Sequence, residues 1–146
     1  MLRTSLPRFL TAGVGIALAL ALLTGCLSSG QTSVAAELNA DRTANRLKAL
    51  PTHPALNAKA QAWAEKLAKG NKLSHSRLVD GAPDCWRSLG ENVGYGGSIA
   101  KVEDAYMQSV KHRANVLSPK WDFVGVGTAT RDNRVFTVQV FMAGCT

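Results

Sequence analysis

The fold is decided by the stretch Phe123-Val-Gly-Val-Gly-Thr-Ala-Thr-Arg-Asp-Asn-Arg-Val-Phe-Thr-Val-Gln-Val-Phe-Met142 near the end of the chain. Asp132-Asn133, at its centre, is a typical two-residue signal for a β-hairpin turn. Beyond the turn, apolar residues occupy every second position from Phe136 to Met142, which indicates a strand with one buried face. We therefore expect two antiparallel strands, Phe123–Arg131 and Arg134–Met142.

Two helices are predicted near the start of the domain. The first spans Val34–Leu50 and ends before Pro51, because proline cannot continue a helix. The second spans Pro54–Lys69 and carries one apolar stripe along its length. Trp63 lies on this stripe, so we expect its side chain to be buried.

A third helix is predicted after Ser98, a favourable N-cap residue, with apolar positions from Ile99 to Val110. Residues 72–98 are rich in glycine and are expected to form a loop that contains one short strand at Glu91–Tyr95. Because the helices come first and the antiparallel strands come last, the order predicts an α+β fold rather than a doubly wound parallel sheet.

The start of the chain resembles the signal peptide of a bacterial lipoprotein. Arg3 and Arg8 supply a positive charge, and Leu10–Leu23 is an apolar run that is too short to cross a bilayer as a helix. The next residues, Leu23-Thr24-Gly25-Cys26, resemble the lipobox, in which the cysteine is acylated and becomes the new N-terminus. The sequence therefore predicts cleavage before Cys26.

This interpretation divides the chain into three parts. Residues 1–25 are the signal peptide, residues 26–33 carry the acylated Cys26 and form a short polar tether, and residues 34–146 form the domain. Several acyl chains, palmitate among them, hold a protein firmly at a membrane surface. We therefore expect an extracytoplasmic domain that is anchored by lipid in a bacterial cell envelope.

Two cysteines, Cys85 and Cys145, remain after Cys26 is assigned to the lipid. An even pair in an oxidising compartment predicts a disulfide, which would stabilise the domain by about 4 kcal/mol on a chain-entropy estimate. Two free thiols are the alternative. A thiolate metal site is not indicated, since the sequence has no CxxC motif and no Cys/His cluster.

The composition is that of an ordinary globular protein, with 46% hydrophobic and 18% charged residues. The formal net charge is +7, and the lysines and arginines are spread thinly rather than gathered into a block. This pattern is consistent with an anionic lipid or a cell-wall polymer as a partner, and it argues against a nucleic acid.

Four segments carry a family resemblance. In order along the chain they are Leu73-Ser74-His75-Ser76, Gly90-Glu91-Asn92-Val93, Ser109-x-x-His112-Arg113-x-Asn115-x-Leu117 and Gly125-Val126-Gly127. Together they resemble the CAP superfamily of cysteine-rich secretory, antigen 5 and pathogenesis-related 1 proteins, and most closely its small bacterial SCP-like branch. The resemblance covers Val34–Cys145 and implies a three-layer α-β-α sandwich around a small antiparallel sheet.

The resemblance also implies a site. In this family a surface cleft holds two histidines and two acidic residues, and some members bind a divalent metal there. His75, Glu91 and His112 match three of these positions, whereas Ser109 stands where the second acidic residue is expected. The implied cleft therefore consists of these four residues, and three of them form a reasonable ligand set for Zn or another divalent metal.

Three roles are open for this cleft. Glu91 could be a structural brace that accepts hydrogen bonds, the three residues could bind a metal, or they could act in catalysis. We assign no catalytic residue; in an enzyme His75, Glu91 and His112 would be the candidates. The replacement by Ser109 favours a binding or interaction module with a His/Glu cleft, and the alternative is a metal-assisted hydrolase of envelope material.

Overall fold

The computed structural model describes residues 26–145, so the expected signal peptide at residues 1–25 lies outside the described residues. In the described part of the chain, the helices are α1 (Ser29–Ala44), α2 (Pro54–Gly70), α3 (Ile99–Gln108) and α4 (Val110–Val116). The strands are β1 (Trp86–Gly96), β2 (Phe123–Arg131) and β3 (Arg134–Gly144). None of the described helices is long and apolar enough to cross a membrane.

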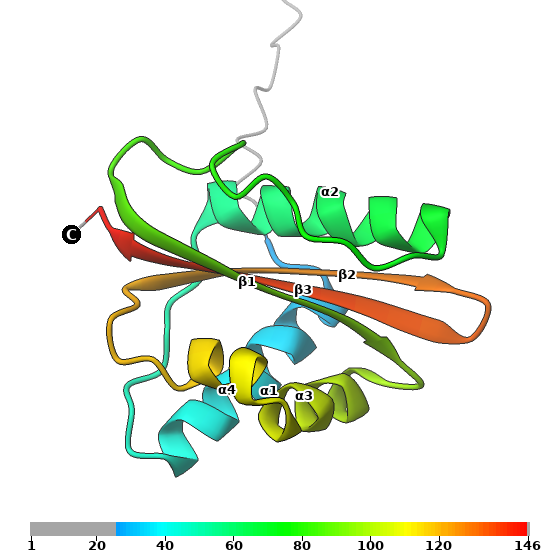
Figure 1. Cartoon of the computed structure of the whole chain (residues 1–146), viewed down its shortest axis with the longest axis horizontal. Coiled ribbons are helices and arrows are strands. Elements are labelled where there is room, and N and C mark those ends of the chain that lie inside the picture. The colour runs from blue at the N-terminus through cyan, green and yellow to red at the C-terminus, as the bar shows by residue number, and fades with distance from the viewer. Residues whose placement is uncertain (1–25, 146) are drawn as a thin grey trace, which may run out of the picture.

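The three strands form one antiparallel sheet in the order β1-β3-β2. The hairpin prediction is confirmed, because β2 and β3 are joined by Asp132 and Asn133, whose φ angles of 49° and 60° suit a type I′ turn. Helix α2 covers one face of the sheet, and α1, α3 and α4 cover the other face (Figure 1). This arrangement is the α-β-α sandwich that the sequence resemblance implies.

Helix α2 lies very close to β2 because the strand has glycine where the helix crosses it. A Cβ atom on Gly125 would lie 2.2 Å from the carbonyl carbon of Leu56, and one on Gly127 would lie 2.2 Å from that of Ala60. A side chain fits at neither position, so the backbones of helix and strand are in direct contact. The Gly125-Val126-Gly127 motif therefore serves packing.

Each face of the sheet has its own apolar core, as the alternation along β3 predicts. The core under α2 is built from buried residues of α2 and β3, which include Leu56, Ala60, Leu67, Phe136 and Val138. The core on the opposite face contains Val34, Leu38, Trp121, Val124 and Phe141.

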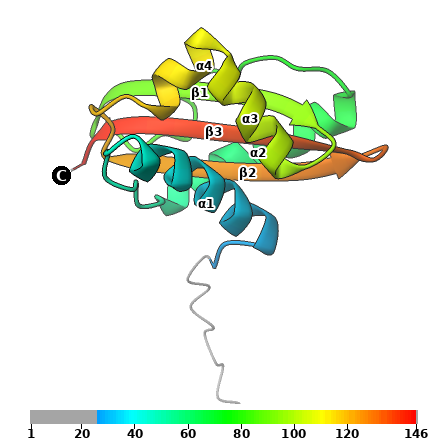
Figure 2. The ribbon, with the colours of Figure 1, turned by 90° about the horizontal axis from the view of Figure 1, so that it is seen from below.

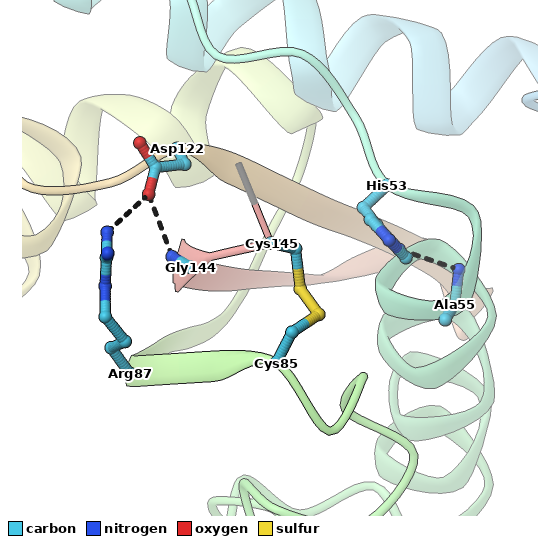
Figure 3. Close-up of a disulfide and its surroundings, with 7 residues drawn as sticks. All are labelled: His53, Ala55, Cys85, Arg87, Asp122, Gly144 and Cys145. Carbon is cyan, nitrogen blue, oxygen red and sulfur yellow. Dashed lines mark hydrogen bonds and ion pairs between the residues drawn. A yellow bond between two sulfur atoms is a disulfide. The ribbon is translucent and has the colours of Figure 1, made fainter.

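A disulfide joins Cys85 to Cys145, as expected, and the two residues are 60 positions apart in the sequence. It links the segment before β1 to the residue after β3 (Figure 3). Nearby, one carboxylate oxygen of Asp122 accepts hydrogen bonds from the Gly144 amide at 2.8 Å and from Arg87 at 3.5 Å. These contacts fix one end of the sheet.

The expected tether at residues 26–33 is not a linker, and this prediction is wrong beyond Ser28. Helix α1 begins at Ser29, and the side chains and amides of Ser28 and Gln31 form a reciprocal capping box. Gln31 is buried, and its Nε2 donates to the Val126 carbonyl of β2 at 2.8 Å. The folded unit therefore starts about two residues after Cys26.

The first helix also ends earlier than Leu50. Asn45 caps α1, and Arg46 has a φ of 62°, which breaks the helix. The side chain of Asn39 then exchanges two hydrogen bonds with the backbone of Leu50, at 2.8 and 3.1 Å, and holds the following segment extended. A local polar cap therefore stops the helix before Pro51.

The expected third helix is two helices. Ser109 has extended backbone angles, φ −90° and ψ 120°, and it separates α3 from α4. Val110, which the pattern places on the apolar face, is 85% exposed because the break turns it into solvent.

Two further expectations differ from the structure. β1 begins five residues before the predicted strand at Glu91–Tyr95, because it pairs with β3 over its whole length. Trp63 is only half-buried: its indole N–H donates to the Ser74 carbonyl at 2.9 Å, and its ring packs against the core under α2 without being enclosed in it.

Candidate functional site

Glu91 lies on β1 and holds the loop that precedes this strand. Its Oε1 accepts the Ser76 amide at 2.9 Å and lies 2.7 Å from His75 Nδ1, and its Oε2 accepts the Ser76 hydroxyl at 2.5 Å. The Glu91 side chain is 2% exposed, whereas that of His75 is 62% exposed. Three hydrogen bonds from two neighbouring residues therefore anchor the loop before β1 to this strand.

The three-ligand metal site does not fit this geometry. Both oxygens of Glu91 and Nδ1 of His75 are engaged in the hydrogen bonds that hold the loop at Ser76. Residues 26–145 contain no group of three or more His, Cys, Asp or Glu side chains placed to hold a metal ion. His75, Glu91 and His112 are therefore not placed to hold a metal ion together.

Two asparagines of the family motifs are structural. The Asn92 amide donates to Gln139 at 3.0 Å and to the His112 carbonyl at 3.2 Å, and Asn115 donates to Asn92 at 3.0 Å and to the Glu91 carbonyl at 3.3 Å. Together they attach α4 to β1. The position of His112 beside the sheet depends on this network.

A buried carboxyl group lies at the far end of the same network. Gln139 Nε2 donates to Glu103 Oε2 at 2.5 Å, while Glu103 Oε1 has no partner among the described residues. Burial raises the pKa of Glu103 to about 7, although the hydrogen bond from Gln139 lowers it; the charges of Asp41 and other nearby carboxylates raise it further.

His112 lines a groove of about 460 Å³ that lies along β1. The groove is mostly apolar, and its lining residues are Leu73, Val93, Gly94, Tyr95, Val102, Ala105, Tyr106, Ser109 and His112. Burial lowers the pKa of His112, and the charge of His75 lowers it further. The imidazole of His112 is therefore neutral at neutral pH and can both donate and accept a hydrogen bond.

The structure brings the four predicted residues to the same edge of the sheet but gives them different roles. His112 and Ser109 line the groove, whereas Glu91 braces a loop and His75 projects from that loop into solvent. Ser109 lies at the break between α3 and α4, where it is the N-cap residue of α4.

Sequence reasoning missed the apolar part of the groove. Tyr106 is buried, its hydroxyl donates to the Thr137 carbonyl at 3.0 Å, and its ring lines the groove with its centroid 5.0 Å from that of His112. Gly94 makes this possible, because a Cβ atom there would lie 2.8 Å from the Tyr106 ring. The spacing of Gly94 and Tyr106 alone gives no signal for such a contact.

A second cavity, of about 510 Å³, lies between α2 and the loop that follows it. Its lining includes Trp63 and Lys59, and Lys59 Nζ donates to the carbonyls of Arg77 and Asp80 at 2.8 and 2.7 Å. The ammonium group of Lys59 therefore holds the loop against α2.

Known proteins share both the sequence pattern and the fold. The family model described as CAP, the cysteine-rich secretory protein family, matches residues 35–141. The uncharacterized protein YkwD of Bacillus subtilis (strain 168) is 31% identical in an alignment of 110 positions that covers 69% of this chain and 43% of that protein. The chain therefore spans less than half the length of this relative.

Several solved structures share the fold. An outer surface protein of Borrelia burgdorferi has a TM-score of 0.69 at 19% identity, over 77% of this chain and 91% of that protein. Venom allergen-like protein 4 of Schistosoma mansoni has a TM-score of 0.68 at 15% identity, with coverages of 82% and 92%. An extracellular SCP-domain protein of Bacillus anthracis has a TM-score of 0.66 at 21% identity, with coverages of 82% and 45%.

Proposed function

The chain belongs to the cysteine-rich secretory protein (CAP) family, and from this premise we propose that it is an extracytoplasmic binding module of the cell envelope. The groove beside His112 would hold an apolar group of an envelope molecule. The bacterial structures that share the fold include an outer surface protein and an extracellular protein, which agrees with a position outside the cytoplasm.

The observation that carries the proposal is the composition of the groove. Its walls are aliphatic and aromatic, with Tyr95 47% exposed, and the polar side chains of Ser109 and His112 stand at one end. A concave, mainly apolar surface with a few polar groups is typical of a ligand site. An apolar side chain or acyl group with an adjacent amide or hydroxyl group would match it.

Lipidation at Cys26 is part of the same proposal. Cys26 is exposed and lines a small cavity with Gln31, Asn57 and Gln61, next to β2. The groove lies along β1, at the opposite edge of the sheet. Because so few residues separate Cys26 from α1, an acylated protein would keep its β2 edge near the bilayer and its groove turned away from it (Figure 2).

The ligand site can be tested with a pair of matched substitutions. Ala105 and Ala100 are both exposed on α3, but only Ala105 lines the groove. Soluble fragments of digested peptidoglycan, or phosphatidylglycerol vesicles in a second arm, would be titrated into the soluble protein. We expect peptidoglycan fragments to bind, Ala105→Trp to lose at least tenfold in affinity, and Ala100→Trp to bind normally. Equal binding by both variants would contradict the groove assignment, and binding of vesicles alone would make the ligand a lipid.

The anchor can be tested separately by membrane fractionation of cells that produce the full chain. Cys26→Ala should move the protein from the membrane fraction to the soluble extracytoplasmic fraction, while Ser29→Ala should leave it in the membrane. Persistent membrane binding of Cys26→Ala would contradict lipidation.

A hydrolase is the second candidate, because Glu91 holds His75 through Nδ1 and leaves Nε2 free to accept a proton. The test is the release of new amino groups from peptidoglycan fragments. Release that is abolished in His75→Gln would support this candidate, and no release by the unmodified protein would exclude it for this substrate.

A further inference from the structure

The backbone of β2 that faces away from the sheet is almost fully hydrogen-bonded. The Val126 amide donates to Asn57 Oδ1 at 3.0 Å, and its carbonyl accepts from Gln31. The side-chain amide of Gln61 donates to the Thr128 carbonyl at 2.9 Å and accepts from the Thr128 amide at 3.0 Å. Val124 is paired with the segment before α2 through the Pro51 carbonyl and the His53 amide.

Successive residues of a strand direct their amide and carbonyl groups to opposite sides. The outward groups of β2 therefore determine which residues of β3 and β1 bond to a neighbouring strand. Because Val126 and Thr128 face outward, the residues between them, such as Gly127, bond to β3 through Val138. The alternate residues of β3, such as Thr137, must then bond to β1 through Gly94. On β1, the backbones of Glu91, Val93 and Tyr95 therefore face away from the sheet.

The outward backbone of β1 is largely unpaired. The Glu91 carbonyl accepts Asn115 Nδ2 at 3.3 Å. In residues 26–145, no hydrogen bond from a loop, helix or side chain reaches the outward amide and carbonyl groups of Val93 or Tyr95. These two residues, with Gly94 between them, also form the wall of the groove beside His112.

We propose that the β1 edge binds an extended peptide, which adds to the sheet as a fourth strand along Val93 and Tyr95. The two outward residues are two positions apart, about 7 Å, which matches alternate residues of an extended peptide. Their four unpaired groups, two donors and two acceptors, are what the backbone of another strand would complete.

The groove supplies a place for one side chain of this peptide. Side chains of an added strand point alternately to the two faces of the sheet, so every second one reaches the side of α3 and α4. There it meets Tyr106, Ala105 and neutral His112. The partner is therefore a peptide segment with an apolar residue flanked by small or polar ones.

This inference rests on the proposed function, because it assigns a peptide as the ligand of the same groove. The soluble protein from Leu27 to Thr146, which contains all the contacts described above, would be labelled with ¹⁵N. The probe is acetyl-Thr-Val-Thr-Phe-Thr-Val-Thr-amide. Two control peptides carry N-methyl groups on the odd or on the even residues, so that only one of the two keeps its edge-facing amides.

Amide hydrogen exchange reports the result residue by residue. We expect the probe at millimolar concentration to slow exchange at Val93 and Tyr95 at least tenfold and to leave Gly94, already bonded to β3, unchanged. One N-methylated peptide should retain binding and the other should lose it. Ala105→Trp should weaken binding, and Ala100→Trp should not.

Two results would overturn the inference. Unchanged exchange at Val93 and Tyr95 with saturating probe, or equal binding of both N-methylated peptides, would exclude strand addition. If peptidoglycan fragments still bind and Ala105→Trp still blocks them, the proposed function stands and only the strand addition fails. If the groove binds neither probe nor fragments, both fail.

Discussion

The two edges of the small sheet are built in opposite ways. At the β2 edge, side chains of Gln31, Asn57 and Gln61 satisfy the outward backbone, and the folded chain begins beside it at Ser28. At the β1 edge, Val93 and Tyr95 present free backbone groups beside a groove. An unpaired edge invites another strand, so proteins usually cover it. This chain pairs the outward backbone of one edge and leaves that of the other without hydrogen-bond partners next to its candidate site, where Val93 is 6% exposed and Tyr95 is 47% exposed.

The difference shows how a three-stranded sheet can serve both stability and binding. The closed edge is also where α2 lies in direct contact with the strand through Gly125 and Gly127. The open edge is held by a disulfide at one end and by the Asn92 and Asn115 network in its middle. The two edges are thus stabilised by different means, by side-chain hydrogen bonds and close backbone packing at the closed edge and by a crosslink and an amide network at the open edge.

The largest effect is expected where α2 meets the closed edge. Gly127→Val places a branched side chain where a Cβ atom alone would lie 2.2 Å from the Ala60 carbonyl carbon. Helix and strand would have to separate, and we expect a loss of about 4 kcal/mol or more, or failure to fold. Gly97→Val is the control, because nothing lies within 4 Å of its Cβ position. Denaturant unfolding measures both, and equal stability would contradict the close packing.

Removal of the disulfide should weaken the open edge at the end where Cys85 and Cys145 are joined. The Cys85→Ser, Cys145→Ser double variant should lose about 4 kcal/mol of unfolding free energy, because the crosslink closes a loop over 60 positions. The hydrogen-exchange rates of the β1 amides should rise more than those of the β2 amides. Ser88→Ala, on the same strand, should change stability little, and a uniform rise in exchange across both strands would contradict a local role for the crosslink.

The buried carboxyl behind the open edge should give the domain a pH-dependent stability. Glu103 binds its proton more tightly in the folded chain, with a pKa of about 7 against 4.5. Its contribution favours folding below pH 4.5 and is lost as the pH rises to about 7, a change of roughly 3 kcal/mol. Glu103→Gln should flatten the stability curve between pH 4.5 and 7. An identical slope in Glu103→Gln and the unmodified protein would contradict this role, and Asp84→Asn is the control, because this exposed carboxyl does not contribute to the pKa of Glu103.

The smallest effect is expected from opening part of the closed edge. Gln61→Leu removes both hydrogen bonds to Thr128 and should cost about 2 kcal/mol, with faster exchange of the Thr128 amide. Gln108→Leu replaces an exposed glutamine of α3 and should be neutral. If both variants have the same stability, the side chain of Gln61 does not close the edge.

Much of the fold could be predicted from the sequence because its signals are local. The hairpin follows from Asp132-Asn133 and from the alternation along β3, and α2 follows from one apolar stripe after Pro54. The start of α1 differs from the prediction, although Ser28-x-x-Gln31 is a capping-box pattern. A lipobox is typically followed by a polar tether, and this short polar segment fits both a tether and a helix start.

The site was predicted less completely because its contacts are between distant residues. His75, Glu91 and His112 can be identified as polar candidates from their motifs, but the motifs do not show that Glu91 uses both oxygens on the loop. The order and register of the strands decide which amides face away from the sheet and lack a hydrogen-bond partner. The residues Val93 and Tyr95 by themselves give no signal for either property. The apolar pattern also predicts one continuous helix across Ser109. In the structure this residue has extended backbone angles that separate α3 from α4, and it lines the groove.

Amide hydrogen exchange of the free protein tests the contrast between the edges most directly. The account predicts that the outward amides of Val126 and Thr128 exchange slowly, because Asn57 and Gln61 accept them, and that those of Val93 and Tyr95 exchange at least a hundredfold faster. Comparable protection at all four amides would show that the β1 edge is already covered, and it would contradict the open edge on which the proposed strand addition depends.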